Sequence, residues 1–121
     1  MRLIDLSGFT VRQDKASAFQ DWVAKNLERI KASYPEGCEF GGIYGTVHTT
    51  DKEGGDFYWL HIHDSYAALD RFAAVAKDPS SESHKITTEF LQFVDPDRHA
   101  PWSHHLLKSV PDLTVFDLPI E

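Results

Sequence analysis

Two histidines that lie two residues apart, His61 and His63, stand in the segment FYWLHIHD at positions 57–64. The pKa of an imidazole lies near neutral pH, so histidine is well suited to take and return a proton in an enzyme pocket. Residues two apart on a strand point to the same side, so the pair could instead share a metal ion. The carboxylate that would complete such a metal motif is missing, because Ala67 and Ala68 stand four and five residues after His63. We therefore predict a catalytic base at His61 and no metal ion at this pair, with metal binding kept as an alternative.

Strand alternation divides this segment into two faces. The uniformly apolar side chains Tyr58, Leu60 and Ile62 are expected to pack under helices, and on the preceding strand Ile43 and Val47 match that side. The opposite face is rich in aromatic and histidine side chains, and we predict that it lines a ligand-binding cavity at a dimer interface. Its members are Phe40, Tyr44, Thr46, His48, Phe57, Trp59, His61 and His63. Among them His48 is a second candidate base, or a third ligand if the histidine pair held a metal.

Other groups that could carry chemistry give weaker signals. His99, His104 and His105 cluster around Trp102, where they could form a surface loop, an arm exchanged in a dimer, a lid over the cavity, or a metal or haem site. A nucleophile is not indicated, because there is no G-x-S-x-G motif and Cys38 has no basic neighbour in the sequence. The Gly-Gly pairs lack the following Lys-Ser/Thr of a phosphate-binding loop.

Charge and composition exclude several kinds of partner. The formal net charge is −7 and no Lys/Arg cluster is present, which argues against nucleic acid and against anionic membrane surfaces. No stretch approaches the roughly 20 apolar residues of a membrane-spanning helix, and the start MRLIDLSGF does not resemble a secretory signal. Cys38 is the single cysteine, which fits a reducing cytoplasm. We expect a cytoplasmic protein that binds a small hydrophobic molecule.

Periodicity predicts the elements that must position these residues. Strands are expected at 2–11, 38–50 and 56–63, and a final short strand at 113–118, with 106–110 as another strand or an arm. Helices are expected at 15–34, capped by Asp14, from Asp64 or Ser65 to 77, and at 82–94 after a break at 78–81. The length fits one domain, 1–121, in which 96–121 forms a C-terminal loop and the last strand.

The resulting order, strand–helix–strand–strand–helix–strand, is that of an α+β ferredoxin-like fold with an antiparallel sheet and helices on one face. The order, the third strand with Trp59 and the following helix DSYAALDRFAA resemble the dimeric α+β-barrel superfamily. That group includes antibiotic-biosynthesis-type monooxygenases and the muconolactone-isomerase-like, EthD-like and stress-responsive proteins. The resemblance implies a homodimer in which two sheets pack face to face, with a pocket in each subunit. In related barrels the helix after the third strand often carries a histidine or polar residue that faces the pocket, and by this resemblance His84, near the start of the third helix at 82–94, is a candidate ligand-binding residue.

Three functions fit these expectations. The first is a small cofactor-independent monooxygenase, isomerase or cyclase that acts on a hydrophobic or aromatic compound, with His61 or His48 as base. The second is a non-catalytic ligand-binding or stress-associated dimer. The third is a haem- or metal-binding barrel that uses His61 and His63 or the C-terminal histidines.

Overall fold

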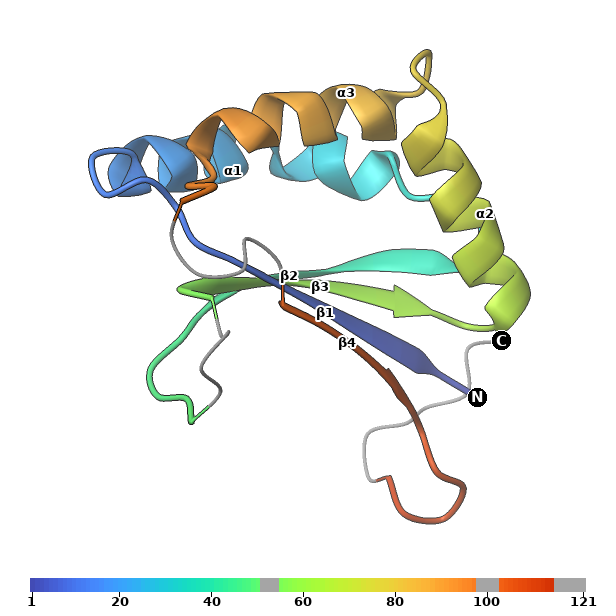
Figure 1. Cartoon of the computed structure of the whole chain (residues 1–121). Coiled ribbons are helices and arrows are strands. Elements are labelled where there is room, and N and C mark those ends of the chain that lie inside the picture. Colours follow the sequence, from blue (N-terminus) through green and yellow to red (C-terminus); the bar gives the residue numbers. More distant parts are fainter. Residues whose placement is uncertain (51–54, 98–102, 115–121) are drawn as a thin grey trace.

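A computed structural model of the chain describes residues 1–50, 55–97 and 103–114. Along the described residues the elements are β1 (Leu3–Phe9), α1 (Ala16–Ala32), β2 (Cys38–Gly45), β3 (Phe57–His63), α2 (Tyr66–Lys77), α3 (Glu82–Phe90), a 3-10 turn (Leu91–Phe93) and β4 (Ser103–Lys108). The four strands form one antiparallel sheet in the order β2-β3-β1-β4. Helices α1 and α3 lie across one face of this sheet, and α2 rises from the end of β3 toward α3 (Figure 1). The predicted ferredoxin-like fold is confirmed, and the sheet of this chain is open rather than closed.

Local signals set the ends of the helices. The Ser65 hydroxyl accepts a hydrogen bond from the Ala68 amide and caps α2, as predicted, and Ser81 caps α3 in the same way through the His84 amide. The predicted cap of α1 by Asp14 is wrong. Lys15 occupies the N-cap position there and makes no side-chain cap bond.

The fourth strand lies earlier in the chain than the predicted strand at 113–118. Strand β4 occupies Ser103–Lys108, close to the alternative at 106–110, and pairs with β1 at the edge of the sheet. Of the predicted strand at 113–118, Leu113 lies in a turn and residues 115–118 fall outside the described part of the chain. No helix among the described residues has the length and apolar character needed to cross a membrane.

Aromatic rings form the core between the sheet and the helices. Phe9 of β1 packs edge-on against Phe19 of α1 and Phe90 of α3, with ring centroids 5.5 and 4.8 Å apart. Trp59 of β3 meets Phe90 at 5.2 Å and is buried. Burying a large apolar side chain contributes about 1.5–3 kcal/mol, so these rings hold α1 and α3 on this face.

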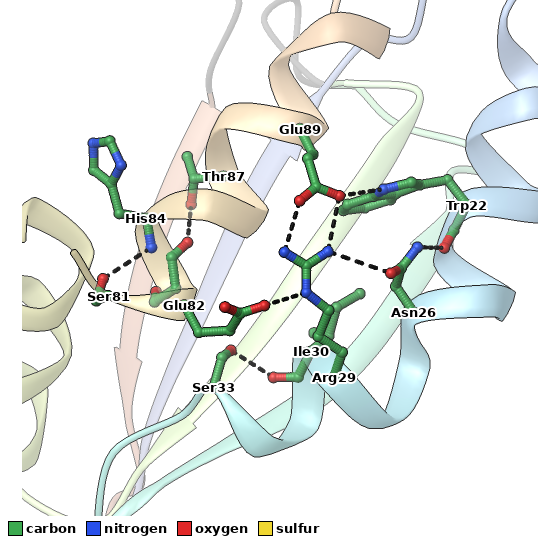
Figure 2. A network of polar contacts seen from close by, with 11 residues as sticks. Trp22, Asn26, Arg29, Ile30, Ser33, Ser81, Glu82, His84, Thr87 and Glu89 are labelled. Atoms are coloured by element: carbon green, nitrogen blue, oxygen red, sulfur yellow. Dashed lines mark hydrogen bonds and ion pairs between the residues drawn. The ribbon is translucent and has the colours of Figure 1, made fainter. Parts of the chain in front are cut away.

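Polar groups join α1 to α3 at the outer side of the core (Figure 2). The guanidinium of Arg29 donates two hydrogen bonds to the carboxylate of Glu89, at 2.8 and 2.6 Å, and also pairs with Glu82. Trp22 donates its indole N–H to Glu89 at 3.2 Å. Partly exposed ion pairs of this kind contribute little each, about 1 kcal/mol or less, so they mainly fix how the two helices lie on each other.

The predicted division of β3 into two faces is confirmed, but the faces were assigned the wrong way round. Phe57, Trp59, His61 and His63 point toward the helices, where Phe57 and Trp59 belong to the core. Their apolar neighbours at positions 58, 60 and 62 lie half-buried on the face that the described helices leave open. The imidazoles can lie on the covered face because other elements supply hydrogen-bond partners for them there.

A β-bulge changes the orientation of β2 partway along the strand. The register shifts between Phe40, which pairs with His61, and Gly42, which pairs with Leu60. Phe40 and Ile43 consequently both pack against the core, whereas Tyr44 lies on the open face and is 52% exposed. The prediction that Ile43 faces the helices is confirmed, and the prediction that Phe40 and Tyr44 share a face is wrong.

Candidate functional site

A pocket of about 200 Å³ lies between the sheet and the helices, beside the aromatic core. Its floor is made by β1 and β3, and its walls come from the C-terminal end of α1 and from α2 and α3. Most of its surface is apolar, with hydroxyl groups and one imidazole among the rings. It is lined by Ser7, Phe9, Ser33, Tyr34, Trp59, His61, Phe72, Ala76, Ser83, Thr87 and Phe90.

Three polar side chains form a hydrogen-bonded chain in the wall of the pocket. The indole N–H of Trp59 donates to the hydroxyl oxygen of Tyr34 at 2.8 Å, and that hydroxyl lies 2.5 Å from Nδ1 of His61. An indole nitrogen can only donate, so the tyrosine oxygen is the acceptor in the first bond and its own proton is free for the second. We assign Nδ1 of His61 as the acceptor, with the proton of the neutral imidazole on Nε2, because this tautomer gives the tyrosine proton a partner whereas Nδ1–H would leave it without one.

Packing keeps the His61 ring uncharged at neutral pH. The ring stacks against Trp59 and lies 4.8 Å from the ring of Phe72 on α2. Burial among these groups lowers the pKa of His61 from 6.5 to about 4, although the nearby carboxylate of Asp5 acts in the opposite direction. At neutral pH the side chain is thus a neutral hydrogen-bonding group.

A buried carboxylate faces the histidines from β1. Asp5 stands opposite His61 in the strand register, its Oδ1 lies 2.6 Å from Nε2 of His104, and its Oδ2 lies 4.0 Å from Nε2 of His63. Ser7 donates a weak hydrogen bond of 3.3 Å to the same Oδ1. Burial alone would raise the pKa of Asp5, but the three facing imidazoles, His63 foremost, together hold it below the usual value.

His63 is completely buried and lies behind this pocket wall rather than in it. Its Nδ1 lies 3.1 Å from the sulfur of Cys38, whose thiol donates to the carbonyl of Ala68 at 3.2 Å. Its Nε2 is buried without a hydrogen-bond partner and faces Asp5 at 4.0 Å. Burial raises the pKa of the Cys38 thiol, which does not favour a thiolate nucleophile.

The structure brings together some of the predicted site residues and separates others. Trp59 and His61 line the pocket, while Phe40 and Phe57 pack against the core beside it. His48 is exposed beyond the end of β2, past the pair Gly45–Phe57 and therefore at the opposite end of the hairpin from His61. Tyr44 lies on the open face. The structure thus separates His48 and Tyr44 from the pocket that contains His61, and the roles predicted for them stay predictions.

His84 does not line the pocket that is described here. Its backbone amide donates to the Ser81 hydroxyl that caps α3. Its ring points away from the contacts that Arg29 of α1 makes with Glu82 and Glu89 of α3 (Figure 2). The adjacent positions on the same helix, Ser83 and Thr87, supply the polar wall instead. The sequence placed the correct helix at the pocket but the wrong residue of that helix.

Within the described residues, no group of three or more His, Cys, Asp or Glu side chains is arranged to hold a metal ion. The rings of His61 and His63 are stacked with centroids 6.3 Å apart, and the Nδ1 atom of each already contacts a neighbouring side chain. Of the C-terminal histidines, His104 lies on β4 beside Asp5, and His99 falls outside the described residues. This arrangement suits hydrogen bonding and proton transfer better than metal coordination.

Three residues of the site were not found from the sequence. They are Tyr34, directly after α1, Asp5 on β1 and Phe72 on α2. Strand alternation could have shown Asp5, because it points to the same side as Leu3 and Phe9, which are fully buried. A carboxylate among buried apolar side chains is a signal for a functional group.

Comparison with solved structures finds this arrangement of elements in several small proteins. A NIPSNAP domain protein from Burkholderia xenovorans matches with a TM-score of 0.65 and 13% identity, over 93% of this chain and 99% of that one. Rv0793 from Mycobacterium tuberculosis matches with a TM-score of 0.60 and 16% identity, over 94% of this chain and 100% of that one. A protein assigned to the antibiotic biosynthesis monooxygenases, from Caulobacter crescentus CB15, matches with a TM-score of 0.60 and 16% identity, over 90% of each chain.

The chain has a ferredoxin-like α+β fold of the kind that these proteins share. No family model and no curated protein matches the sequence. At these sequence identities the likeness establishes the fold, and the chemistry must be argued from the site itself.

Proposed function

We propose that the protein binds a small, mostly apolar compound in the pocket beside Tyr34 and His61, and that these two residues take a proton from it. The observation that carries this proposal is the hydrogen-bonded chain Trp59–Tyr34–His61 in the wall of an otherwise apolar pocket. A dry pocket with one polar wall is the usual form of a small-molecule site, and a base must lie within hydrogen-bond reach of the proton it takes.

The hydrogen-bond directions define how the proton moves. The tyrosine oxygen accepts a proton from a C–H or O–H group of the ligand, while its own proton passes to Nδ1 of His61. The bond to hydrogen in the ligand breaks and a new O–H bond forms on Tyr34. The original O–H bond of Tyr34 breaks and an N–H bond forms at Nδ1 of His61. The ligand becomes an anion and His61 becomes an imidazolium. The indole N–H of Trp59 continues to donate to the tyrosine oxygen throughout, which fixes that oxygen in place.

The size and surface of the pocket limit the class of ligand. A cavity of about 150 Å³ accommodates benzene, so the volume of about 200 Å³ here suits one ring or two fused rings. The aromatic rings that line it favour an aromatic or alicyclic body, and the hydroxyl groups favour one or two oxygen atoms. An activated ketone, an enol or a phenol of that size carries the acidic hydrogen that the mechanism requires.

Such an anion is the starting point of isomerisation, of ring closure and of reaction with dioxygen without a cofactor. We therefore propose a cofactor-independent monooxygenase, isomerase or cyclase, as the sequence suggested. The fold shared with proteins assigned to the antibiotic biosynthesis monooxygenases supports this choice. The alternative is a protein that binds such a compound without transforming it.

Deuterium exchange at an acidic C–H group tests the proton transfer directly. The probe is 2-tetralone, whose two fused rings suit the pocket, with exchange at C1 in heavy water followed by NMR. The protein should accelerate exchange, Tyr34→Phe and His61→Gln should each lower the acceleration at least about tenfold, and Tyr44→Phe should leave it unchanged. Tyr44 is the matched control because its hydroxyl lies on the open face.

The outcomes of this experiment separate the alternatives. Binding of 2-tetralone in calorimetry without faster exchange would favour the non-catalytic protein and overturn the proton transfer. Exchange that is equally fast in the Tyr34→Phe and Tyr44→Phe variants would overturn the assignment of the site.

We also propose that the protein forms a homodimer through the open face of the sheet. This face carries a continuous row of apolar side chains across three strands, in which Ile62, Ile4 and Leu107 are register partners. An exposed apolar surface of this kind is typical of an interface, and a second copy would present the same row. Leu60→Glu should give a monomer in light scattering, whereas Ala74→Glu on the exposed side of α2 should not change the mass.

A monomeric native protein would contradict the dimer and leave the pocket proposal untouched.

We also propose a cytoplasmic location, because the single cysteine, Cys38, is a buried free thiol that suits a reducing compartment.

A further inference from the structure

The carboxylate of Asp5 has no role in the proton transfer as described so far, although it is almost completely buried beside the pocket. Ionised carboxylates are rarely buried unless charges or hydrogen bonds compensate them. Here the compensation comes from three imidazoles on two different strands, His61 and His63 on β3 and His104 on β4. A buried negative charge that three histidines share is a candidate for a role in their protonation.

The strand register places this carboxylate next to His61, because Asp5 of β1 and His61 of β3 are register partners. His63, two residues further along β3, directs Nδ1 toward Cys38 of β2 and Nε2 toward Asp5. His61 uses Nδ1 for Tyr34, so Nε2 is the ring nitrogen that remains available to a further partner.

The remaining contact of the carboxylate is at the surface. His104 is 59% exposed, and its Nε2 lies 2.6 Å from Oδ1 of Asp5. The carboxylate of Asp5 would stabilise a positive charge on His104 as well as one on His61. The two positive charges also repel each other, so each disfavours the other. The described groups that face His61 are thus Asp5 from β1, His63 from its own strand, His104 from β4, Tyr34 after α1, and the apolar ring of Phe72 from α2.

We propose that Asp5 is a positioning residue that stabilises the protonated form of His61, and that His104 regulates this by competing for the same carboxylate. The proposal rests on the proposed proton transfer, because it explains how a buried imidazole can accept a proton there. A neutral His104 leaves the full charge of Asp5 to His61, whereas a charged His104 neutralises part of it. The exposed edge strand β4 therefore transmits the pH of the solution to the pocket.

Titration of the histidine side chains by NMR tests this without any ligand. Asp5→Asn should lower the pKa of His61 by about one unit or more, because it removes the opposite charge. His104→Gln should raise the pKa of His61, because the amide can still donate to Asp5 but carries no charge. A merely structural role of these residues would not shift the pKa of His61 in opposite directions.

Two controls make the measurement decisive. Asp78→Asn changes an exposed carboxylate directly after α2 and should leave the titration of His61 unchanged. The exposed ring of His48, beyond the end of β2, provides an internal reference in every variant. If Asp5→Asn folds poorly, His104→Gln at the exposed edge still tests the proposal on its own.

A His61 pKa that is the same in wild type and His104→Gln, or that rises in Asp5→Asn, would overturn the inference. Failure of the exchange experiment with 2-tetralone would instead concern the proton transfer and the ligand. The two proposals therefore fail by different measurements.

Discussion

Acid should destabilise this protein through His61 in a defined pH range. The pKa of the side chain is about 4 in the folded protein and 6.5 when unperturbed, so between these values the unfolded chain binds more protons than the folded one. The free energy of unfolding must then fall as the pH falls through this range. One pKa unit corresponds to about 1.4 kcal/mol, so the complete effect of His61 is roughly 3 kcal/mol, of which roughly 2 kcal/mol appears between about pH 7 and pH 4.5.

Urea unfolding of wild type and His61→Gln at these two pH values measures this effect. The wild-type protein should lose about 2 kcal/mol more than the variant on acidification, because glutamine has no proton to gain. His48→Gln is the control, since His48 is exposed and its replacement should preserve the full loss. The lowered pKa of Asp5 does not affect this comparison. The stability that Asp5 contributes is lost only at lower pH, and Asp5 is present in all three proteins. An equal loss in wild type and His61→Gln would refute the reasoning.

Three further changes test other parts of the structure. Tyr34→Phe should lower the free energy of unfolding by about 1–3 kcal/mol in urea, because it leaves Nδ1 of His61 and a buried indole N–H without partners. Gly55→Ala should destabilise by more than about 2 kcal/mol, since the new Cβ would lie 2.4 Å from a backbone nitrogen of β1, whereas Gly45→Ala meets nothing nearer than 4.0 Å and should be nearly neutral in thermal unfolding. Glu89→Gln should cost less than about 1 kcal/mol in urea, since its ion pair is partly exposed; a loss above 2 kcal/mol would contradict this.

Element order and strand alternation were enough to predict the fold. The helical spacing of the first and third helices, the break at 78–81 and the alternation around Trp59 led to the correct order of elements and to the ferredoxin-like fold. These features are local, and local patterns are what a single sequence shows most clearly.

The assignment of the two faces of β3 failed for a non-local reason. Both faces of a central strand carry large side chains, so hydrophobicity alone favoured Leu60 and Ile62 for the core. The histidines lie on the covered face because Tyr34 and Cys38 contact their Nδ1 atoms and Asp5 supplies an opposite charge, and these three residues come from other places in the sequence. His61 lies in the pocket wall, and its role as a base stays a prediction; its partners could be found only once the elements were packed together.

The bulge at Gly41 has a consequence for how this strand can change during evolution. Phe40 and Tyr44 lie four positions apart and would share a face in a regular strand, yet Phe40 packs against the core and Tyr44 lies on the open surface. The extra residue is Gly41, because the pairs on either side of it continue the alternation of a regular strand. Deletion of Gly41 would therefore give a regular strand in which Phe40 and Ile43 still face the core and Tyr44 still faces outward. This is the one position of β2 where the chain can lose a residue without exchanging the two faces of the strand.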